Sequence, residues 1–308
     1  MKEIENSRTS VVVTSVARCS LAGSAQSPTT RVQTRFRVFG LIGTGGIGDV
    51  YAAEYLETRR ACAIKILKPP LRAKPDSVCR FVREATILAR FRSRYIVDVI
   101  ALGWLPDDTP CIVMEWLLGQ DLRRLLDCQR RLPSCLAAKL IYQACLGICA
   151  MHAAHLRHGD LKPANLFVQD RGHQHRDCKL LDLGAAVSWT DPQPRPIAGT
   201  LRYMAPEQLQ NTAIIDPRAD LYAVGTVLYE CLAGHPPFLA DSLERVLFAI
   251  MHDDAPRLDQ LVCDVPRGLA AVVSKALARR ASERFSSAEE LAAALAPFAQ
   301  STRGSRRL

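Results

Sequence analysis

The stretch that decides the fold is His158-Gly159-Asp160-Leu161-Lys162-Pro163-Ala164-Asn165, near the middle of the chain. Asp160 and Asn165 are five positions apart in a predicted loop whose backbone is restricted by Pro163. A carboxylate can accept a hydroxyl proton, and an amide oxygen can bind a hard cation. Lys162 can neutralise a phosphoryl group that is being transferred. The stretch is therefore a candidate catalytic loop.

A second acidic motif follows a short strand predicted at 178–181. Asp182, within Leu181-Asp182-Leu183-Gly184, offers another hard oxygen ligand, and Gly184 lets the backbone turn. Two further segments precede the predicted helices of the last third, Gly199-Thr200 and Met204-Ala205-Pro206-Glu207.

A glycine-rich turn lies upstream, at Gly43-Thr44-Gly45-Gly46-Ile47-Gly48-Asp49-Val50. Glycines let backbone N–H groups approach a phosphate without clashes from Cβ atoms. A dinucleotide-binding fold needs a helix directly after such a turn, whereas residues 50–55 read as a strand. An ordinary hairpin remains the alternative for this turn on its own.

Lys65 lies inside a predicted apolar strand, Ala61–Leu67. An ammonium group in that setting is unfavourable unless it meets an anion. Glu84, on a helix predicted over 76–92, is a natural partner that would hold Lys65 toward the phosphates of a nucleotide. For any lone lysine, a surface position with a packed stem is the alternative.

The order of these motifs resembles that of the eukaryotic-type (Hanks-type) protein kinase family, in the serine/threonine branch found in bacteria. The resemblance covers residues 35–298. It implies an α+β, two-lobed protein kinase fold, with a small antiparallel β-lobe holding one main helix and a larger, mainly helical lobe. It also implies transfer of the ATP γ-phosphoryl group to protein Ser or Thr hydroxyls, with ATP and Mg²⁺, or Mn²⁺ in its place, as cofactors.

Composition and the change from a strand-rich to a helix-rich pattern divide the chain into three expected parts. Residues 1–34, rich in Ser and Thr, are expected to be a disordered arm. Residues 35–298 would form the kinase domain, with an N-lobe at 35–116, a C-lobe at 120–298 and a ligand cleft between the lobes. Residues 299–308 are expected to be a basic tail.

The resemblance also assigns catalytic roles. Lys65 would contact the α- and β-phosphates and pair with Glu84. Asp160 would orient the substrate hydroxyl and accept its proton, while Lys162 would stabilise the γ-phosphoryl group.

Asn165 and Asp182 would hold the metal ion by the same resemblance. Met114 would guard the back of the adenine pocket, and the Glu115 carbonyl and Leu117 amide would hydrogen-bond the adenine. Val50, Ala63 and Phe167 would enclose the adenine ring, and the phosphates would be covered by Gly43, Thr44, Gly45, Gly46, Ile47 and Gly48.

Three more positions are expected to be structural, again by resemblance. Glu207 would form a buried ion pair with Arg284, and Asp220 would anchor the backbone of the catalytic loop. Lys162 and Thr200 favour Ser/Thr over Tyr as acceptors.

Two positions depart from the family pattern. Gly159 stands where many members have an arginine that binds a phosphorylated residue of the activation loop. Because that receptor is missing, activity is predicted not to require phosphorylation of the loop strictly. Leu183 replaces the usual phenylalanine, a mild apolar change. Ser188 and Thr190 are the candidate autophosphorylation sites.

Composition argues against several other classes of protein. The chain has 308 residues, a net charge of +9 and 6% aromatic residues. With no basic helix, this argues against a nucleic-acid-binding protein. No run of about 18 uncharged apolar residues is seen, so no membrane span is predicted. The 11 cysteines contain no CxxC pair, and no secretion signal is seen, which predicts a cytoplasmic protein with reduced thiols. The oligomeric state stays open.

Two other functions remain as alternatives. A pseudokinase or ATP-binding scaffold would use the fold without turnover, although every polar residue needed for transfer is present. A small-molecule kinase is disfavoured because Gly199-Thr200 and Ala205-Pro206-Glu207 resemble a peptide-docking segment. His152, His155 and His158 could form a metal site at helical spacing, but packing and capping are the preferred roles.

Overall fold

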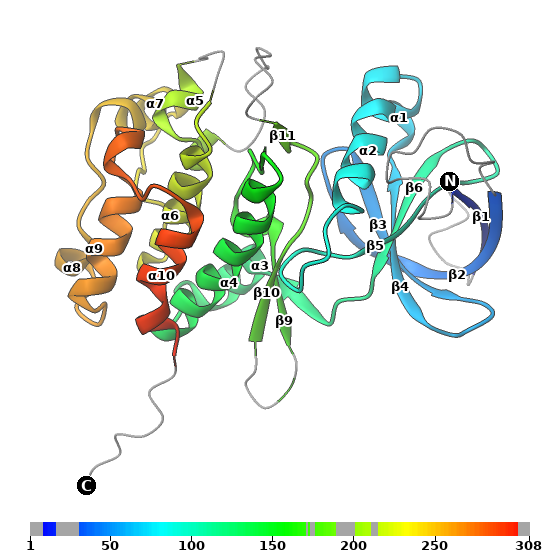
Figure 1. Ribbon diagram of the computed structural model, residues 1–308, viewed down its shortest axis with the longest axis horizontal. Coiled ribbons are helices and arrows are strands. Elements are labelled where there is room, and N and C mark those ends of the chain that lie inside the picture. Colours follow the sequence, from blue (N-terminus) through cyan, green and yellow to red (C-terminus); the bar gives the residue numbers. More distant parts are fainter. Residues whose placement is uncertain are drawn as a thin grey trace, which may run out of the picture. The chain divides into compact units, whose positions relative to one another are not determined.

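The computed structural model describes residues 9–16, 31–170, 172, 176–188, 201–210 and 215–300 (Figure 1). The chain divides into two compact units, Met1–Leu117 and Leu118–Leu308. The first unit is built on an antiparallel sheet and the second is mainly helical. The predicted α+β class, with a small β-lobe and a larger helical lobe, is confirmed.

Six antiparallel strands form a closed barrel in the first unit, in the order β1-β2-β3-β4-β6-β5. Its interior is apolar because alternate residues of each strand face inward: Phe36, Val38, Ile64 and Val113 are at most 2% exposed. Two helices follow the fourth strand, α1 (Pro69–Arg72) and α2 (Pro75–Leu88). The strands are β1 (Thr9–Val16), β2 (Arg31–Thr44), β3 (Gly48–Tyr55), β4 (Ala61–Leu67), β5 (Val99–Trp104) and β6 (Pro110–Glu115).

The expected disordered arm is wrong for residues 9–16 and 31–34. Strand β1 pairs with β2 along its whole length and with β5 through Thr14–Val16, which closes the barrel. The run Thr9–Val16 is rich in Val and Thr, which fit a pleated strand, and Val13 is fully buried in the barrel core. Residues 1–8 and 17–30 of the predicted arm lie outside the described residues.

The second unit is organised around two apolar helices. Helix α6 (Arg218–Ala233) is buried from Ala219 to Leu232, as expected for a helix that is apolar on all sides. Helix α4 (Ser134–Ala153) packs against α6 and α10 (Ala288–Ala299). Helices α4, α6 and α10 are seen together in Figure 1. The remaining helices are α3 (Leu122–Gln129), α5 (Pro206–Leu209), α7 (Leu243–His252), α8 (Leu258–Leu261), α9 (Arg267–Ala276) and the 3₁₀ turns η2 (Pro163–Asn165), η3 (Leu201–Tyr203) and η4 (Ala281–Glu283).

Helix α4 is also long and apolar enough to cross a membrane by length and composition. Its 18-residue apolar window is 56% buried inside the protein. Leu140, Ile141, Cys145 and Ile148 are completely buried. Packing in the core of the second unit therefore accounts for its apolar character.

Two small ladders position the predicted catalytic segments. Strand β9 (Leu166–Asp170) lies between β7 (Gly119–Asp121) and β10 (Arg176–Leu180). Strand β8 (Leu156–Arg157) pairs with β11 (Val187–Ser188). The predicted catalytic loop therefore runs from the end of β8 to the start of β9, and Asp182 lies between β10 and β11. Residues 301–308 of the predicted tail are outside the described part of the chain.

Candidate active site

The glycine-rich turn joins β2 to β3 in the first unit. It is closed by a hydrogen bond from the Gly45 N–H to the Gly48 carbonyl, at 2.9 Å. A Cβ atom added at Gly48 would lie 2.9 Å from the Ile66 carbonyl oxygen and 3.2 Å from Lys65 Cγ, whereas one at Gly46 would meet nothing within 4 Å. Glycine is thus sterically required at Gly48, where the turn passes close to Lys65.

The predicted ion pair between Lys65 and Glu84 is confirmed. Lys65 Nζ lies 2.6 Å from Glu84 Oε1, and the two side chains are 7% and 1% exposed. Strand β4 supplies the lysine and helix α2 supplies the glutamate, which is buried beside Phe81 and Ala85. The pair fixes the ammonium group at the barrel wall.

The strand register gathers the predicted adenine-pocket residues of the first unit around Lys65. Val50 pairs directly with Lys65 across β3 and β4, and Ala63 pairs with Met114 across β4 and β6. Residues paired in this way, and residues two apart on one strand, share a face of the sheet. Val50, Ala63 and Met114 therefore lie on the face that carries Lys65.

The last strand of the barrel ends at Glu115. Its backbone N–H donates to the Asp98 carbonyl at 3.0 Å, and its Oε1 accepts from the Asp98 N–H at 2.8 Å. These bonds fix the chain just before Leu117, the second predicted adenine contact. Phe167, the third residue predicted to enclose the ring, is half-buried on β9 of the second unit.

The catalytic-loop residues gather around Asp160 in the second unit. Lys162 Nζ lies 2.6 Å from Asp160 Oδ2. Asn165 Nδ2 donates to the Asp160 carbonyl at 2.7 Å and to Asp160 Oδ2 at 3.3 Å. Pro163 opens the 3₁₀ turn η2 that brings Asn165 back toward Asp160. The Asp160 carboxylate is 18% exposed, so a substrate hydroxyl can reach it.

The oxygen donors of Asn165 and Asp182 fit a hard cation. Because Asn165 donates its amide nitrogen to Asp160, its Oδ1 is the atom that it can offer to a metal. Asp182 has a left-handed backbone, with φ of 47°, and its Oδ1 accepts from the Gly184 N–H at 3.1 Å. Such backbone strain gathers at functional sites.

Cysteine and histidine play no part in this donor set. Within the described ranges, no group of three or more His, Cys, Asp or Glu side chains is arranged to hold a metal ion alone. A cation at Asn165 and Asp182 would take its other ligands from nucleotide phosphates and water, as Mg²⁺ commonly does.

Asp220 anchors the backbone of the catalytic loop, as expected. From the start of α6, its carboxylate accepts hydrogen bonds from the N–H groups of His158 and Gly159, at 2.8 and 3.0 Å. Burial alone would raise the pKa of Asp220. The hydrogen bond and charge of His152, the charge of His158 and the Gly159 N–H together lower that pKa below its ordinary value. The loop is therefore held by a buried, ionised carboxylate.

His152 is a supporting residue that sequence reasoning did not assign to the catalytic loop. Its Nε2 lies 3.0 Å from Asp220 Oδ2. His158 uses its own Nε2 on the Leu181 carbonyl at 3.3 Å. The spacing of six residues between His152 and His158 could not predict these partners, because Asp220 and Leu181 lie in other elements. His173 and His175 lie outside the described residues.

The structure explains the glycine at position 159, which the sequence alone does not. Its φ of 77° is in the left-handed region, and a Cβ atom there would lie 3.0 Å from the Ala185 carbonyl oxygen. In this chain the backbone itself favours glycine at the position where many kinases have arginine. Leu183, the other departure, is fully buried.

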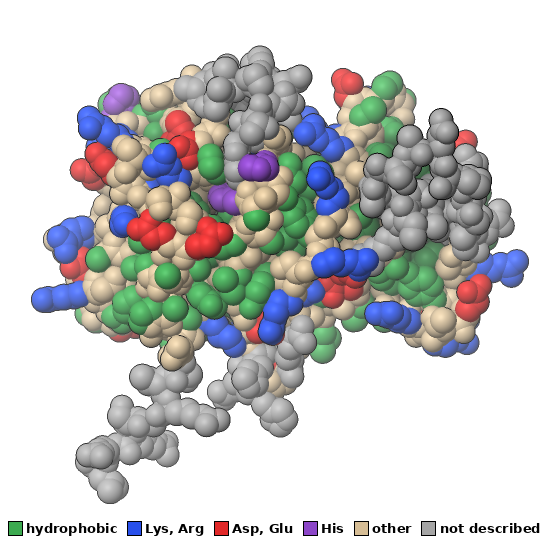
Figure 2. Space-filling model, viewed as in Figure 1, with side chains coloured by type: hydrophobic (Ala, Val, Ile, Leu, Met, Phe, Trp, Pro, Cys, Tyr) green, Lys and Arg blue, Asp and Glu red, His purple; other side chains and the backbone are tan. Residues whose placement is uncertain are grey.

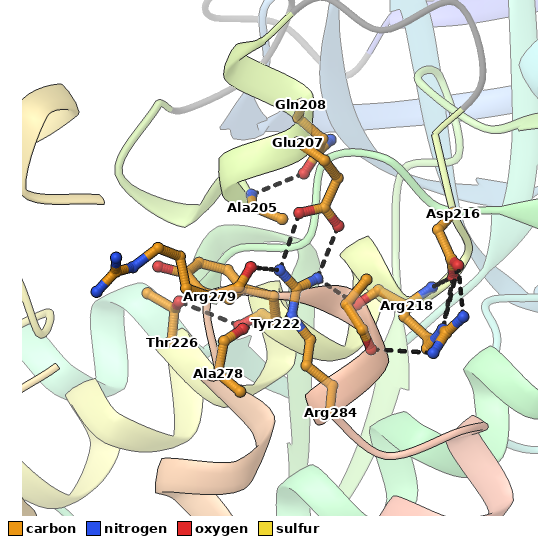
Figure 3. Close-up of polar contacts among 11 residues, drawn as sticks. Ala205, Glu207, Gln208, Asp216, Arg218, Tyr222, Thr226, Ala278, Arg279 and Arg284 are labelled. Carbon is orange, nitrogen blue, oxygen red and sulfur yellow. Dashed lines mark hydrogen bonds and ion pairs between the residues drawn. The ribbon is translucent and has the colours of Figure 1, made fainter. Parts of the chain in front are cut away.

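The predicted ion pair between Glu207 and Arg284 is also confirmed (Figure 3). Arg284 Nη1 and Nη2 donate to the two Glu207 oxygens at 2.7 and 2.8 Å, a bidentate pair. The same guanidinium donates to three main-chain carbonyls, those of Arg218, Ala278 and Arg279. It joins the segments around α5, α6 and η4.

Known proteins resemble the chain over most of its length. The protein kinase domain family matches residues 36–295. Serine/threonine-protein kinase PknD of Mycobacterium tuberculosis is 35% identical over 263 residues, which are 84% of this chain and 39% of PknD. PknB of Mycolicibacterium smegmatis is 32% identical over 269 residues, 85% of this chain and 42% of PknB. The chain therefore spans less than half the length of these two relatives.

PknL of Mycobacterium tuberculosis is a shorter relative. It is 32% identical over 274 residues, which are 87% of this chain and 67% of PknL. The matched residues include the glycine-rich turn, the Lys65–Glu84 pair and the catalytic loop. The chain belongs to the protein kinase domain family, in its bacterial Hanks-type serine/threonine branch.

Proposed function

We propose that this chain is an ATP-dependent serine/threonine protein kinase, which transfers the γ-phosphoryl group of ATP to Ser and Thr hydroxyls of proteins. One observation carries the proposal: Lys162 and Asn165 both contact the Asp160 carboxylate, on a loop whose backbone is bound to Asp220. The relatives named as serine/threonine-protein kinases support the same acceptor class.

Phosphoryl transfer depends mainly on positioning and charge neutralisation. In the proposed mechanism, Asp160 orients the substrate hydroxyl and accepts its proton. Lys162 offsets the charge of the γ-phosphoryl group, and Lys65, oriented by Glu84, offsets that of the α- and β-phosphates. The N–H groups of the glycine-rich turn approach the phosphates because Gly48 has no Cβ.

The family uses ATP and a divalent metal ion. We propose Mg²⁺ as that ion, with Mn²⁺ as the alternative, held by Asn165 Oδ1 and the Asp182 carboxylate. When bound, the ion would offset the negative charge of the phosphates. Chelation with EDTA should abolish transfer, and the initial rates restored by added Mg²⁺ and Mn²⁺ will rank the two ions.

A transfer assay tests the function. The full chain is incubated with labelled ATP, MgCl₂ and a generic basic protein, beside Asp182→Asn. Label on Ser and Thr of protein with wild type, and its loss with Asp182→Asn, would support the proposal. ATP binding without transfer would instead identify a pseudokinase or scaffold, and label in a small metabolite alone would identify a small-molecule kinase.

Autophosphorylation is expected at Ser188 or Thr190. Ser188 belongs to β11, and Thr190 lies outside the described residues. Because Gly159 provides no guanidinium, turnover of the double variant Ser188→Ala/Thr190→Ala should stay within about a hundredfold of wild type. A greater loss would contradict this prediction. Mass spectrometry of ATP-treated wild type, with Asp182→Asn as control, will locate the modified hydroxyls.

Three further expectations concern partners and location. On the face drawn in Figure 2, Lys and Arg side chains are interspersed with Asp and Glu. Protein substrates, and no nucleic acid, stay the expected partners. A cytoplasmic location is proposed from the cysteine pattern and is tested by cell fractionation. The oligomeric state stays open, and light scattering would determine it.

A further inference from the structure

Arg157 is a buried cation that the proposed mechanism does not use. It is the last residue of β8, directly before the catalytic loop, and is only 8% exposed. Its guanidinium makes no hydrogen bond and no ion pair within the part of the chain that the structure describes. Arginine is rarely buried to this extent without a partner, because its desolvation is then uncompensated.

The two carboxylates whose charges act on Arg157, those of Asp220 and Glu207, already have other partners. Asp220 binds His152 and the catalytic-loop backbone, and Glu207 binds Arg284 in a bidentate pair. Burial, the largest influence, lowers the pKa of Arg157, although the charges of Asp220 and Glu207 act in the opposite direction. Neither carboxylate forms an ion pair with Arg157, so within the described residues its charge is offset only at longer range.

The position of Arg157 connects both halves of the catalytic machinery in the second unit. Arg157 pairs with Val187 of β11, across the ladder that β8 and β11 form. Asp160 lies three residues after Arg157, and Asp182 lies five residues before Val187. An anion that fixed Arg157 would therefore stiffen a ladder that borders both carboxylates.

We propose that Arg157 is the receptor for a phosphate group. The planar guanidinium fork matches two phosphate oxygens at once, and a dianion supplies the charge that the surroundings lack. The group could be a phosphorylated Ser or Thr of this chain, which rests on the proposed function, or inorganic phosphate. Bound phosphate stabilises the second unit and changes turnover less than tenfold, since Asp160, Lys162 and Asp182 do not depend on it for their charge.

The first test removes the charge in the absence of phosphate. Arg157→Met keeps an apolar stem of similar length and deletes the uncompensated cation. Dephosphorylated Arg157→Met should therefore melt at least as high as dephosphorylated wild type in a phosphate-free buffer. Arg280→Met, at a position where the arginine side chain is 81% exposed, is the matched control and should leave the melting temperature unchanged. A clearly lower melting temperature for Arg157→Met would overturn the proposal.

The second test adds the anion. Inorganic phosphate is titrated into the full chain carrying Asp182→Asn, which is expected not to phosphorylate itself. The receptor should give a saturable rise in melting temperature, about 2 °C or more, that Arg157→Met abolishes and Arg157→Lys retains in part. Equal responses with and without Arg157, or no response in this and the next arm, would overturn the proposal.

The third test separates the two sources. Wild type is treated with ATP and MgCl₂ and then with a phosphatase, and its melting temperature is followed at each step. A rise that the phosphatase reverses, and that Arg157→Met lacks, identifies a phosphorylated residue of this chain. If wild type incorporates no label at all, the proposed function fails, while the phosphate titration still decides whether Arg157 is a receptor.

Discussion

Two buried ion pairs, one in each unit, use similar charges for different purposes. In the first unit Lys65 Nζ lies 2.6 Å from Glu84 Oε1. In the second unit Arg284 binds both oxygens of Glu207 and donates to three main-chain carbonyls as well. The guanidinium thus uses every donor inside the protein, whereas a lysine presents a compact charge with rotatable donors.

The difference shows what distinguishes a structural cation from one that can bind a ligand. A structural cation has all its donors bound inside the protein, whereas a ligand-binding cation keeps donors available. Arg284, with all its donors used, has nothing left for a phosphate. Lys65 lies beside the turn at Gly48, where a Cβ atom would be 3.2 Å from its Cγ. Arg157 is the extreme case, since it is only 8% exposed and its guanidinium has no hydrogen bond or ion pair among the described residues.

The largest effect on stability is expected from Arg284→Met. Removing Arg284 takes the bidentate partner from Glu207 and a donor from three carbonyls, and breaking a buried, hydrogen-bonded pair typically destabilises a protein by about 3–5 kcal/mol. Urea unfolding of the full chain measures the loss. Arg131→Met is the control, because its ion pair with Asp264 is at least half exposed and is worth less than about 1 kcal/mol. Similar losses in both variants would show that the Arg284 network is not a structural centre.

Lys65→Met should act on catalysis. Loss of one preorganised charge at the phosphates is expected to lower kcat/KM for ATP by about 10²–10³. The variant also leaves Glu84 with a buried charge, so some stability is lost with it. In the double variant Lys65→Met/Glu84→Gln, the urea midpoint should recover toward wild type while the activity does not.

That double variant tests the comparison directly. If activity recovers together with stability, Lys65 acts only as a structural cation like Arg284, and its proposed phosphate contact is wrong. Lys68→Met serves as control, since Lys68 lies one residue beyond the same strand and its Nζ is 3.6 Å from Asp49 Oδ1. Its kcat/KM should stay within about threefold of wild type.

Much of this comparison could be predicted from the sequence because the chemistry depends on residue types at set positions along the chain. Lys65 is an ammonium in an apolar strand and needs an anion, which pointed to Glu84. Asp220 and the pair Glu207–Arg284 came from the family resemblance, and their contacts are confirmed. The roles of these residues toward ATP stay predictions.

The rest depended on contacts that no local pattern encodes. Strand β1 was missed because Thr9–Val16 becomes a strand through pairing with both β2 and β5. The burial of Arg157 was missed because β8 has only two residues, too few to show a periodicity. The crowding at Gly48 depends on the Ile66 carbonyl from another strand.

Asp220→Asn should weaken the anchor of the catalytic loop by about 1–3 kcal/mol at neutral pH. The pKa of Asp220 is lowered in the folded protein, so its contribution is complete above its ordinary value of 3.8 and is lost as the pH falls below that value. The difference in unfolding free energy between wild type and Asp220→Asn should therefore shrink below about pH 4. Urea unfolding from pH 7 to pH 3 measures it. A difference that is independent of pH would mean that Asp220 is not ionised in the fold.

The last contrast is between two glycines of the turn, and the smallest effect is expected from Gly46→Ala. Gly48→Ala puts a methyl group 2.9 Å from a backbone oxygen, which cannot yield as a flexible side chain can, so a loss of about 1–3 kcal/mol is expected together with a higher KM for ATP. Gly46→Ala meets nothing within 4 Å and should change stability by less than about 0.5 kcal/mol. Urea unfolding and ATP kinetics of the two variants give the contrast. If Gly46→Ala raised KM as much as Gly48→Ala, the turn would need glycine for its flexibility, and the crowding of Gly48 against the Ile66 carbonyl would not be the reason for the higher KM.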